Sequence, residues 1–220
     1  MNVPQVKICG ITSSSQAIEC AKLGADAIGM VFYDKSPRNI SAIVAGRIAE
    51  SINGLAIPVA VTVDMPIDEL LCTAMITGIS TFQLHGNEDA EYINRLRKAG
   101  LRSIKHVNAS GERLVELADG FSDCYALLVE CGKGELPGGN GAKWNWSQSS
   151  SISGKHPFIL AGGLNCENVS EAIISSQADA VDVSSALEKE PGIKDMGLVK
   201  EFIEQSKNTN LKREVKRIFK

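Results

Sequence analysis

The feature that most constrains the fold is a repeat in which short β-branched or apolar runs alternate with longer segments of different periodicity. The longer segments carry apolar residues at three- and four-residue spacing, which is typical of helices. Successive short runs begin roughly 20 to 30 residues apart, the length of one strand, loop and helix. The eight strand-like runs are 5–11, 26–33, 57–64, 80–86, 102–107, 124–130, 158–163 and 178–185.

Eight such units in 220 residues predict an α/β fold, a compact (β/α)8 TIM barrel that forms a single domain over residues 1–220. Several helix-like segments close on a glycine suited to a left-handed helix end, as at Gly24, Gly78 and Gly100. The sixth helix has the weakest pattern. The competing architecture is a doubly wound open sheet, but no GxGxxG motif follows the first run. The basic segment 210–220 is predicted to be a solvated last helix.

The composition gives no indication of nucleic acid or a membrane as a partner of this chain. The chain is 44% hydrophobic and 22% charged, with a net charge of −3, which gives no electrostatic reason to expect nucleic acid or an anionic membrane. No apolar run approaches the roughly 20 residues of a membrane span, and the N-terminus lacks the pattern of a signal peptide. Six cysteines are scattered without a CxxC pair. These features predict a cytoplasmic protein without disulfides or a structural metal.

Polar residues near the ends of the strand-like runs share one parity. Because side chains alternate between the two faces of a strand, one parity of a barrel strand points inward and the other toward the helices. Polar groups gathered at the inner strand ends predict a site at the carboxyl mouth of the barrel. An interior salt bridge is the favoured interpretation for Lys7 alone. The residues assigned to the inner face are Lys7, Cys9, Thr62, Asp64, Gln83, His85, Glu130, Asp182 and Ser184.

The sixth run ends on a carboxylate, Glu130, and leads into a segment with five glycines, "CGKGELPGGNGAKW". A charge at the edge of a core is costly unless something uses it. We therefore expect Glu130 to act on a ligand, with the glycine-rich segment covering it.

Two turns have the composition of a phosphate site. The seventh run ends on Gly162 and Gly163, and the eighth ends on Ser184 and Ser185, the latter predicted to cap a short helix. The corresponding loops of TIM barrels often hold phosphate through backbone N–H groups. Two ordinary tight turns are the alternative, and each signal alone is weak.

Six segments together resemble the phosphoribosylanthranilate isomerase family of tryptophan biosynthesis, over nearly the whole chain. They are "VKICGIT", "GMVFYDKSPRNIS", "FQLHGNE", "GGNGAKWNW", "FILAGGLNCENV" and "VDVSSALEKEPGIKD". The resemblance implies a (β/α)8 isomerase without metal or organic cofactor. It also implies a sugar-phosphate substrate, N-(5-phosphoribosyl)anthranilate, which an Amadori rearrangement converts into a carboxyphenylamino-deoxyribulose phosphate. A monomer or homodimer is expected.

By the same resemblance, Cys9 corresponds to the family's general base, Glu130 to its general acid and Arg38 to the arginine that contacts the anthranilate carboxylate. Phosphate is expected near the two turns, and the sugar is expected against the remaining polar residues. The implied binding residues are Gln83, His85 and Asp182 for the substrate, and Gly162, Gly163, Ser184 and Ser185 for its phosphate. Since a nearby cation lowers a thiol pKa, we also expect Lys7 to activate Cys9.

The chain differs from the family at the position of the general acid. The family usually has aspartate where this chain has Glu130, and a misplacement of about 1 Å costs about 10²-fold in rate. We expect the loop to reseat the carboxylate; the alternatives are Glu135 as the acid or an altered activity. Two other functions stay open: a histidine-pathway type of sugar-phosphate isomerase, which uses two aspartates, and a catalytically silent phosphate-ligand binder.

Overall fold

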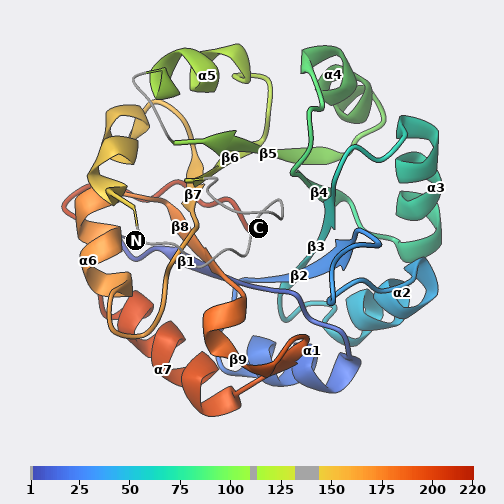
Figure 1. Cartoon of the computed structure of the whole chain (residues 1–220), viewed down its shortest axis with the longest axis horizontal. Coiled ribbons are helices and arrows are strands. Elements are labelled where there is room, and N and C mark those ends of the chain that lie inside the picture. The colour runs from blue at the N-terminus through green and yellow to red at the C-terminus, as the bar shows by residue number, and fades with distance from the viewer. Residues whose placement is uncertain (1, 110–112, 132–143) are drawn as a thin grey trace.

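The structure, a computed structural model, describes residues 2–109, 113–131 and 144–220. Eight parallel strands close into a barrel in chain order, with each strand hydrogen-bonded to the next and β8 paired with β1. Figure 1 shows these strands at the centre of a ring of helices. The strands are β1 (Gln5–Cys9), β2 (Ala27–Phe32), β3 (Ile57–Thr62), β4 (Thr81–Leu84), β5 (Arg102–Asn108), β6 (Ala126–Glu130), β7 (Phe158–Leu160) and β8 (Ala180–Val183). The predicted fold class is confirmed.

Helices follow the strands, and several of them begin at a side chain that accepts an otherwise unpaired backbone N–H group of the first turn. Ser13, Asp89 and Asp195 do so at α1, α4 and α7. Gly78 closes α3 in the left-handed conformation, as predicted. The weakly patterned sixth helix is the 3₁₀ segment η1 (Trp146–Ile152). The other helices are α1 (Ser14–Lys22), α2 (Ala42–Ser51), α3 (Ile67–Thr77), α4 (Ala90–Lys98), α5 (Leu114–Gly120), α6 (Val169–Ser176), η2 (Ser185–Leu187) and α7 (Met196–Lys207).

Two apolar cores lie on the two faces of the barrel wall. The larger core lies between the strands and the helices and includes Val6 and Ile8 of β1. The smaller core fills the barrel interior and includes Val59 of β3 and Ile104 of β5. This division matches the alternation of side chains along each strand. A short antiparallel hairpin, β9 (Glu188–Glu190) and β10 (Ile193–Lys194), follows η2.

The predicted inner parity of β3 is wrong. Val61 and Val63 line the cavity at the mouth, so Thr62 takes the outward face, where its Oγ1 is buried without a hydrogen-bond partner among the described residues. Asp64 lies in the loop after β3 and accepts a hydrogen bond from the Asn87 backbone N–H. Alternation alone allows either set of alternating residues in this run to face the barrel interior. Because Thr62 is buried against the helices, Val61 and Val63 face inward.

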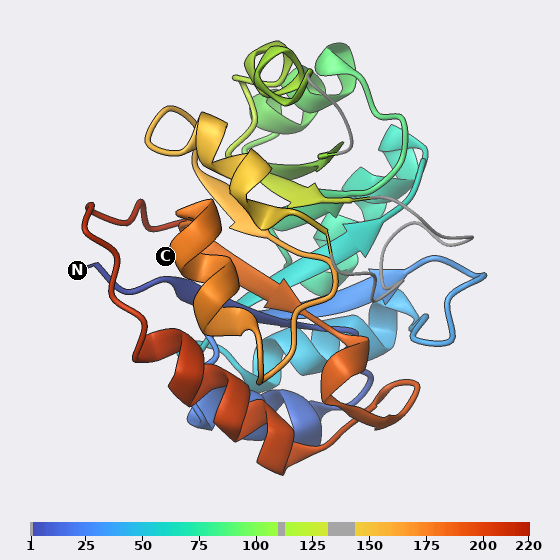
Figure 2. The same cartoon turned by 60° about the vertical axis from the view of Figure 1, so that its left-hand side comes forward.

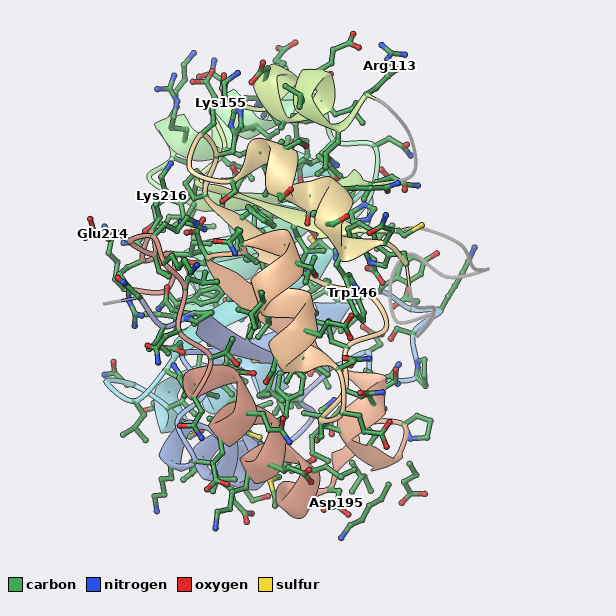
Figure 3. The ribbon with its side chains drawn as sticks, turned by 90° about the vertical axis from the view of Figure 1, so that its left-hand side faces the viewer. Arg113, Trp146, Lys155, Asp195, Glu214 and Lys216 are labelled. Carbon is green, nitrogen blue, oxygen red and sulfur yellow. The ribbon has the colours of Figure 1, made fainter. Side chains whose placement is uncertain are left out.

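The segment after α7 is not the solvated helix that its basic pattern predicts. Residues 208–220 have no regular secondary structure, and Ile218 and Phe219 are buried in the interior core. The backbone N–H of Leu211 donates to the Asn2 carbonyl, and Figure 2 shows the two termini at the same end of the barrel. Figure 3 shows Lys216 on this segment at the same end as Lys155, whose carbonyl accepts from Lys216 Nζ at 3.1 Å. The segment closes the amino end of the barrel.

None of the helices within the described ranges has the length and apolar character that a bilayer span requires.

Candidate active site

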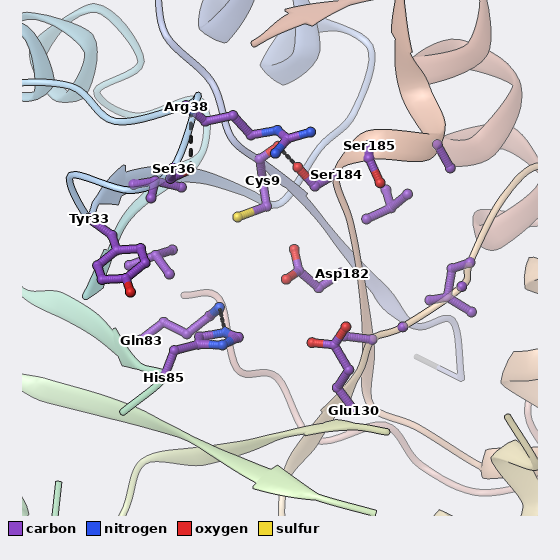
Figure 4. A pocket seen from close by; sticks show the side chains of 18 of the residues that line it. Cys9, Tyr33, Ser36, Arg38, Gln83, His85, Glu130, Asp182, Ser184 and Ser185 are labelled. Carbon is purple, nitrogen blue, oxygen red and sulfur yellow. Dashed lines mark hydrogen bonds between the residues drawn. The ribbon is translucent and has the colours of Figure 1, made fainter. Parts of the chain in front are cut away.

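The carboxyl ends of the strands surround one cavity of about 180 Å³. This is the end at which the loops after TIM-barrel strands deliver side chains from several directions. The structure brings all of the sequence-predicted site residues to this cavity (Figure 4). They are Cys9, Arg38, Gln83, His85, Glu130, Gly162, Gly163, Asp182, Ser184 and Ser185.

Cys9, the last residue of β1, lies in the wall of the cavity and is 8% exposed. Figure 4 shows its sulfur directed into the cavity. A Cβ at Gly29 of β2 would lie 2.8 Å from Cys9 Sγ and 3.0 Å from Lys7 Nζ. Glycine at this position therefore leaves the room that both side chains occupy.

The expectation that Lys7 makes the Cys9 thiol acidic is only half right. Burial raises the pKa of Cys9, and the opposing effect of the Lys7 charge is smaller. Lys7 is fully buried, and its Nζ donates to Asp182 Oδ1 at 2.9 Å. The interior salt bridge favoured for Lys7 is thus confirmed. In the free protein Cys9 is therefore a thiol at neutral pH, not a thiolate.

Glu130 ends β6 and is 5% exposed. A Cβ at Gly162 would lie 2.9 Å from Glu130 Cγ, so the glycine after β7 provides the space for the longer glutamate stem. Figure 4 shows the Glu130 carboxyl directed into the cavity from the side across from Cys9. The alternative acid, Glu135, lies outside the described residues, as does most of the predicted covering segment.

Arg38 is held in place by two residues that the sequence reasoning did not single out. Its guanidinium donates from Nε and Nη2 to the two carboxylate oxygens of Glu188, at 2.8 and 2.6 Å. Lys194 Nζ donates to Glu188 Oε1 at 2.7 Å and to the Ser184 carbonyl at 3.0 Å. Burial raises the pKa of Glu188, but the hydrogen bonds from Arg38 and Lys194 outweigh it, so the net shift is downward. Both residues lie within the motif "VDVSSALEKEPGIKD", which was the available signal.

Gly10 explains the path of the Arg38 side chain. This glycine has a φ of +80°, and a Cβ there would lie 2.5 Å from Arg38 Cδ. The side chain of Arg38 therefore crosses the loop after β1 through space that only glycine leaves open. The planar guanidinium fork suits a carboxylate, as the Glu188 contact shows.

The two turns predicted to bind phosphate lie together at the mouth. Gly162 and Gly163 have φ values of +86° and +69°, which side chains other than glycine rarely adopt. Ser184, rather than Ser185, occupies the cap position of η2, and it makes no side-chain capping bond. Its Oγ donates instead to the Cys9 carbonyl at 3.0 Å, so the predicted cap at Ser185 is wrong. The loop glycines and Ser185 border the cavity from β7 and β8.

The β4 side of the cavity carries a polar pair. The side-chain nitrogen of Gln83 and Nε2 of His85 lie 2.6 Å apart and form a hydrogen bond. Gln83 Oε1 and His85 Nδ1 are buried and have no hydrogen-bond partner among the described residues. Burial and the neighbouring His106 hold the pKa of His85 well below its ordinary value, so its ring is neutral at neutral pH.

His106 of β5 is a further polar residue that the sequence reasoning passed over. It has the same parity as Ile104, which lies in the interior core, so alternation along 102–107 could have found it. Its ring stacks on that of His85, with centroids 4.8 Å apart and planes 10° from parallel. One donor atom each of His85, His106 and Glu130 lies within 4.8 Å of the others, the spacing of a group that can hold a metal ion.

The fold and the site define the class of protein as a (β/α)8-barrel enzyme. A carboxylic acid, a thiol and two glycine-containing or serine-containing turns surround one cavity at the carboxyl end of its barrel. The family model for N-(5'-phosphoribosyl)anthranilate (PRA) isomerase matches residues 6–205. The chain belongs to this family.

Individual relatives agree with this assignment. The N-(5'-phosphoribosyl)anthranilate isomerase of Desulfatibacillum aliphaticivorans is 42% identical over 219 residues, covering 100% of both chains. That of Rhizobium etli is 37% identical over 206 residues, covering 91% of this chain and 93% of the relative. The crystal structure of phosphoribosyl anthranilate isomerase from Thermotoga maritima has a TM-score of 0.86 at 36% identity, covering 93% of this chain and 98% of that one.

A second solved structure carries a ligand. It is phosphoribosyl anthranilate isomerase in complex with reduced 1-(o-carboxyphenylamino)-1-deoxyribulose 5-phosphate. Its TM-score with this chain is 0.83 at 35% identity, with 93% of this chain and 98% of that chain covered.

Proposed function

We propose that this chain isomerises N-(5'-phosphoribosyl)anthranilate to 1-(2-carboxyphenylamino)-1-deoxyribulose 5-phosphate, an Amadori rearrangement in tryptophan biosynthesis. The observation that carries the proposal is the placement of Cys9 and Glu130 on two sides of one cavity (Figure 4). Membership of the isomerase family supports the choice of substrate. The product-analogue complex of a relative supports it as well.

The reaction needs one acid and one base. Glu130, in its protonated form, donates a proton to the ring oxygen of the ribose, and the anthranilate nitrogen supplies the electrons that open the ring to an iminium ion. Cys9 then removes the proton on C2, which gives an enolamine that relaxes to the ketone. Acid and base each contribute about 10²–10⁴-fold to such a reaction.

The raised pKa of Cys9 sets a condition on this mechanism. A thiol is a poor base, so Cys9 has to release its proton to solvent and become a thiolate when the substrate binds. The iminium ion formed by ring opening places a positive charge beside C2, and an opposite charge nearby favours the charged form of a buried group. Lys7 acts in the same direction. Ring opening therefore prepares the base for the second step.

We assign three walls of the cavity to three parts of the substrate. Arg38 is proposed to bind the anthranilate carboxylate. Its guanidinium either leaves Glu188 to do so or binds both carboxylates at once. The apolar side chains at the ends of β2 and β3 are proposed to contact the aromatic ring. The turns at Gly162, Gly163, Ser184 and Ser185 are proposed to bind the phosphate through backbone N–H and hydroxyl groups. Gln83, His85 and Asp182 are proposed to line the sugar. The apolar residues are Val31, Val61 and Val63, with Tyr33 beside them.

We further propose a single domain over residues 1–220, working in the cytoplasm as a monomer or homodimer without nucleic acid as a partner. A relative from Thermotoga maritima is described as a dimeric enzyme from which monomers were generated. Its chain is 34% identical to this one, with a TM-score of 0.81. Sedimentation of the purified protein is the experiment that tests the oligomeric state of this chain.

The test of the function is direct. Purified protein, without added metal or nucleotide, is expected to consume N-(5'-phosphoribosyl)anthranilate, followed by the loss of its anthranilate fluorescence. Glu130→Gln is expected to lose far more turnover than Glu135→Gln. The reverse order would assign the acid to Glu135. No consumption above background would reject the enzyme assignment, and binding of a product analogue without turnover would favour a silent ligand binder.

A further inference from the structure

Three metal-binding side chains converge where adjacent strands end on one side of the mouth. His85 follows β4, His106 lies near the end of β5 and Glu130 ends β6. One ligand atom of each lies within 4.8 Å of the other two. Two imidazoles and one carboxylate make up a common set of protein ligands at zinc sites that keep a position open.

The three ligand atoms have to move slightly closer together before all of them can bind one ion. Any three points no more than 4.8 Å apart share a point that lies within about 2.8 Å (4.8/√3) of each. Zinc binds imidazole nitrogen and carboxylate oxygen at roughly 2.0–2.2 Å. Each donor therefore has to move by less than about 1 Å, a distance within the reach of the three side-chain torsions of Glu130.

The orientation of the two imidazoles decides how they can reach one ion. His85 Nδ1 is buried and without a partner in the described part of the chain. The near-parallel stack of the rings means that at least one ring has to turn before both nitrogens face one ion.

Neighbouring cations do not prevent a divalent ion from binding. Lys7 Nζ is paired with Asp182 at 2.9 Å, and Lys105 Nζ is paired with Glu88 at 2.7 Å and with the Gly86 carbonyl at 2.6 Å. Within the described part of the chain, these two ammonium charges are thus each balanced by a carboxylate.

We propose that His85, His106 and Glu130 form a binding site for a divalent transition-metal ion of the zinc class, and that an occupied site inhibits the enzyme. The second half rests on the proposed function. An ion bound by the Glu130 carboxylate keeps it ionised and away from the sugar, so it no longer donates a proton to the ring oxygen. The ion is an inhibitor of the active site and not a cofactor of the reaction.

Cobalt(II) is the probe for the site, because its absorption bands report the ligand type. Protein stripped with a chelator is titrated with Co²⁺ alone, and with Zn²⁺ by calorimetry. One equivalent is expected to bind, with visible d–d bands and without a near-ultraviolet sulfur-to-cobalt band. His106→Phe keeps a ring on which His85 can stack but removes the donor, and it is expected to weaken binding by at least about tenfold. His156→Gln, a histidine hydrogen-bonded to Asp119 away from the mouth, is the matched control and is expected to bind normally.

Inhibition is measured on the same proteins. Zn²⁺ at its binding concentration is expected to stop turnover of the unsubstituted enzyme, a chelator is expected to restore it, and His106→Phe is expected to retain a larger fraction of its own activity. Circular dichroism checks that His106→Phe is folded, and His106→Gln replaces it if it is not. Unweakened binding by the His106 variants would overturn the site, and so would a sulfur-to-cobalt band, which would assign the ion to a cysteine such as Cys9. If no protein shows turnover, the proposed function fails while the cobalt titration still decides the metal site.

Discussion

The two ends of the barrel use buried polar groups in opposite ways. At the amino end, Gln5 donates to the Phe219 carbonyl at 2.7 Å and accepts from the backbone N–H groups of Ile218 and Phe219 at 2.6 and 3.0 Å. At the carboxyl end, Gln83 and His85 make one bond to each other and leave Gln83 Oε1 and His85 Nδ1 without partners among the described residues. Two glutamines at similar depth therefore have different tasks.

The difference teaches where this chain places stability and where it places reactivity. A buried polar group that makes all of its hydrogen bonds helps to define the fold, whereas a buried polar group with unused bonding capacity costs free energy until a ligand completes it. The amino end is completed by the chain itself, through its C-terminal segment. We propose that the substrate completes the carboxyl end.

The largest expected effect is at the carboxyl end. Cys9→Ala and Glu130→Gln are each expected to lower kcat/KM by about 10²–10⁴-fold, the contribution of one acid or base. The free energy of unfolding should change by no more than about 1 kcal/mol, because Glu130→Gln keeps the size of the side chain and Cys9→Ala removes only one sulfur atom. Fluorescence assays and urea unfolding measure the two quantities. A large loss of stability in both variants would break the proposed division between the ends.

The matching experiment at the amino end removes Asp179, which is fully buried. Its carboxylate accepts from Arg213 and from the Lys216 N–H, both at 2.9 Å, and from the Phe158 N–H at 3.1 Å. Asp179→Ala is expected to lower the free energy of unfolding by about 3 kcal/mol and to leave kcat/KM unchanged.

Asp119 is the matched surface control for Asp179. Its side chain is 45% exposed and pairs with Lys155 and with His156, both at 2.7 Å. Because exposed pairs contribute little, Asp119→Ala is expected to cost at most about 1 kcal/mol in urea unfolding. Equal losses in the two variants would contradict the structural role given to the buried carboxylate.

A smaller effect is expected in the pH dependence of stability. The pKa of His106 is about 4 in the folded protein and close to the ordinary 6.5 in the unfolded chain, so the unfolded chain takes up the proton first as pH falls. Stability is therefore fully present above pH 6.5 and is lost between pH 6.5 and 4. Between pH 7 and pH 5 the unsubstituted protein is expected to lose about 1–2 kcal/mol more than His106→Phe. Identical losses in urea unfolding would show that His106 is not held neutral.

The smallest expected change concerns Lys7. Its charge opposes the effect of burial on Cys9, so Lys7→Met is expected to shift the midpoint of Cys9 alkylation to higher pH, followed by mass spectrometry of the Cys9 peptide. Lys189→Met is the control, because Lys189 is 64% exposed and its charge is screened by solvent. An unchanged midpoint in Lys7→Met would remove Lys7 from the account of the thiol.

Much of the fold and of the candidate site follows from local patterns. Strand and helix periods are properties of neighbouring residues, so eight alternating units already implied the barrel that is observed. The carboxyl ends of parallel strands meet at one mouth, so residues as distant in the chain as Cys9 and Ser185 were expected to lie together there. The positive φ of Gly162 and Gly163 likewise agrees with a need for glycine after the seventh run.

What local patterns left open required contacts between distant segments. The basic segment 210–220 reads as a solvated helix, yet its apolar residues Ile218 and Phe219 close the barrel against Gln5, more than 200 positions away in the chain. The face chosen by Thr62 depended on which side of β3 the helices bury. A periodic pattern records which residues are apolar, but it does not record which surface will cover them.

The electrostatics were the least predictable part. Sequence alone indicated the residue types at the mouth and the proximity of Lys7 to Cys9. Only the tertiary structure decided that burial outweighs the lysine at the Cys9 thiol, that Glu188 holds Arg38, and that His106 stacks on His85. The physical reason is that the pKa of a group depends on its Coulomb interactions with all surrounding groups and on the free-energy cost of its desolvation. Both are set only once the chain has folded.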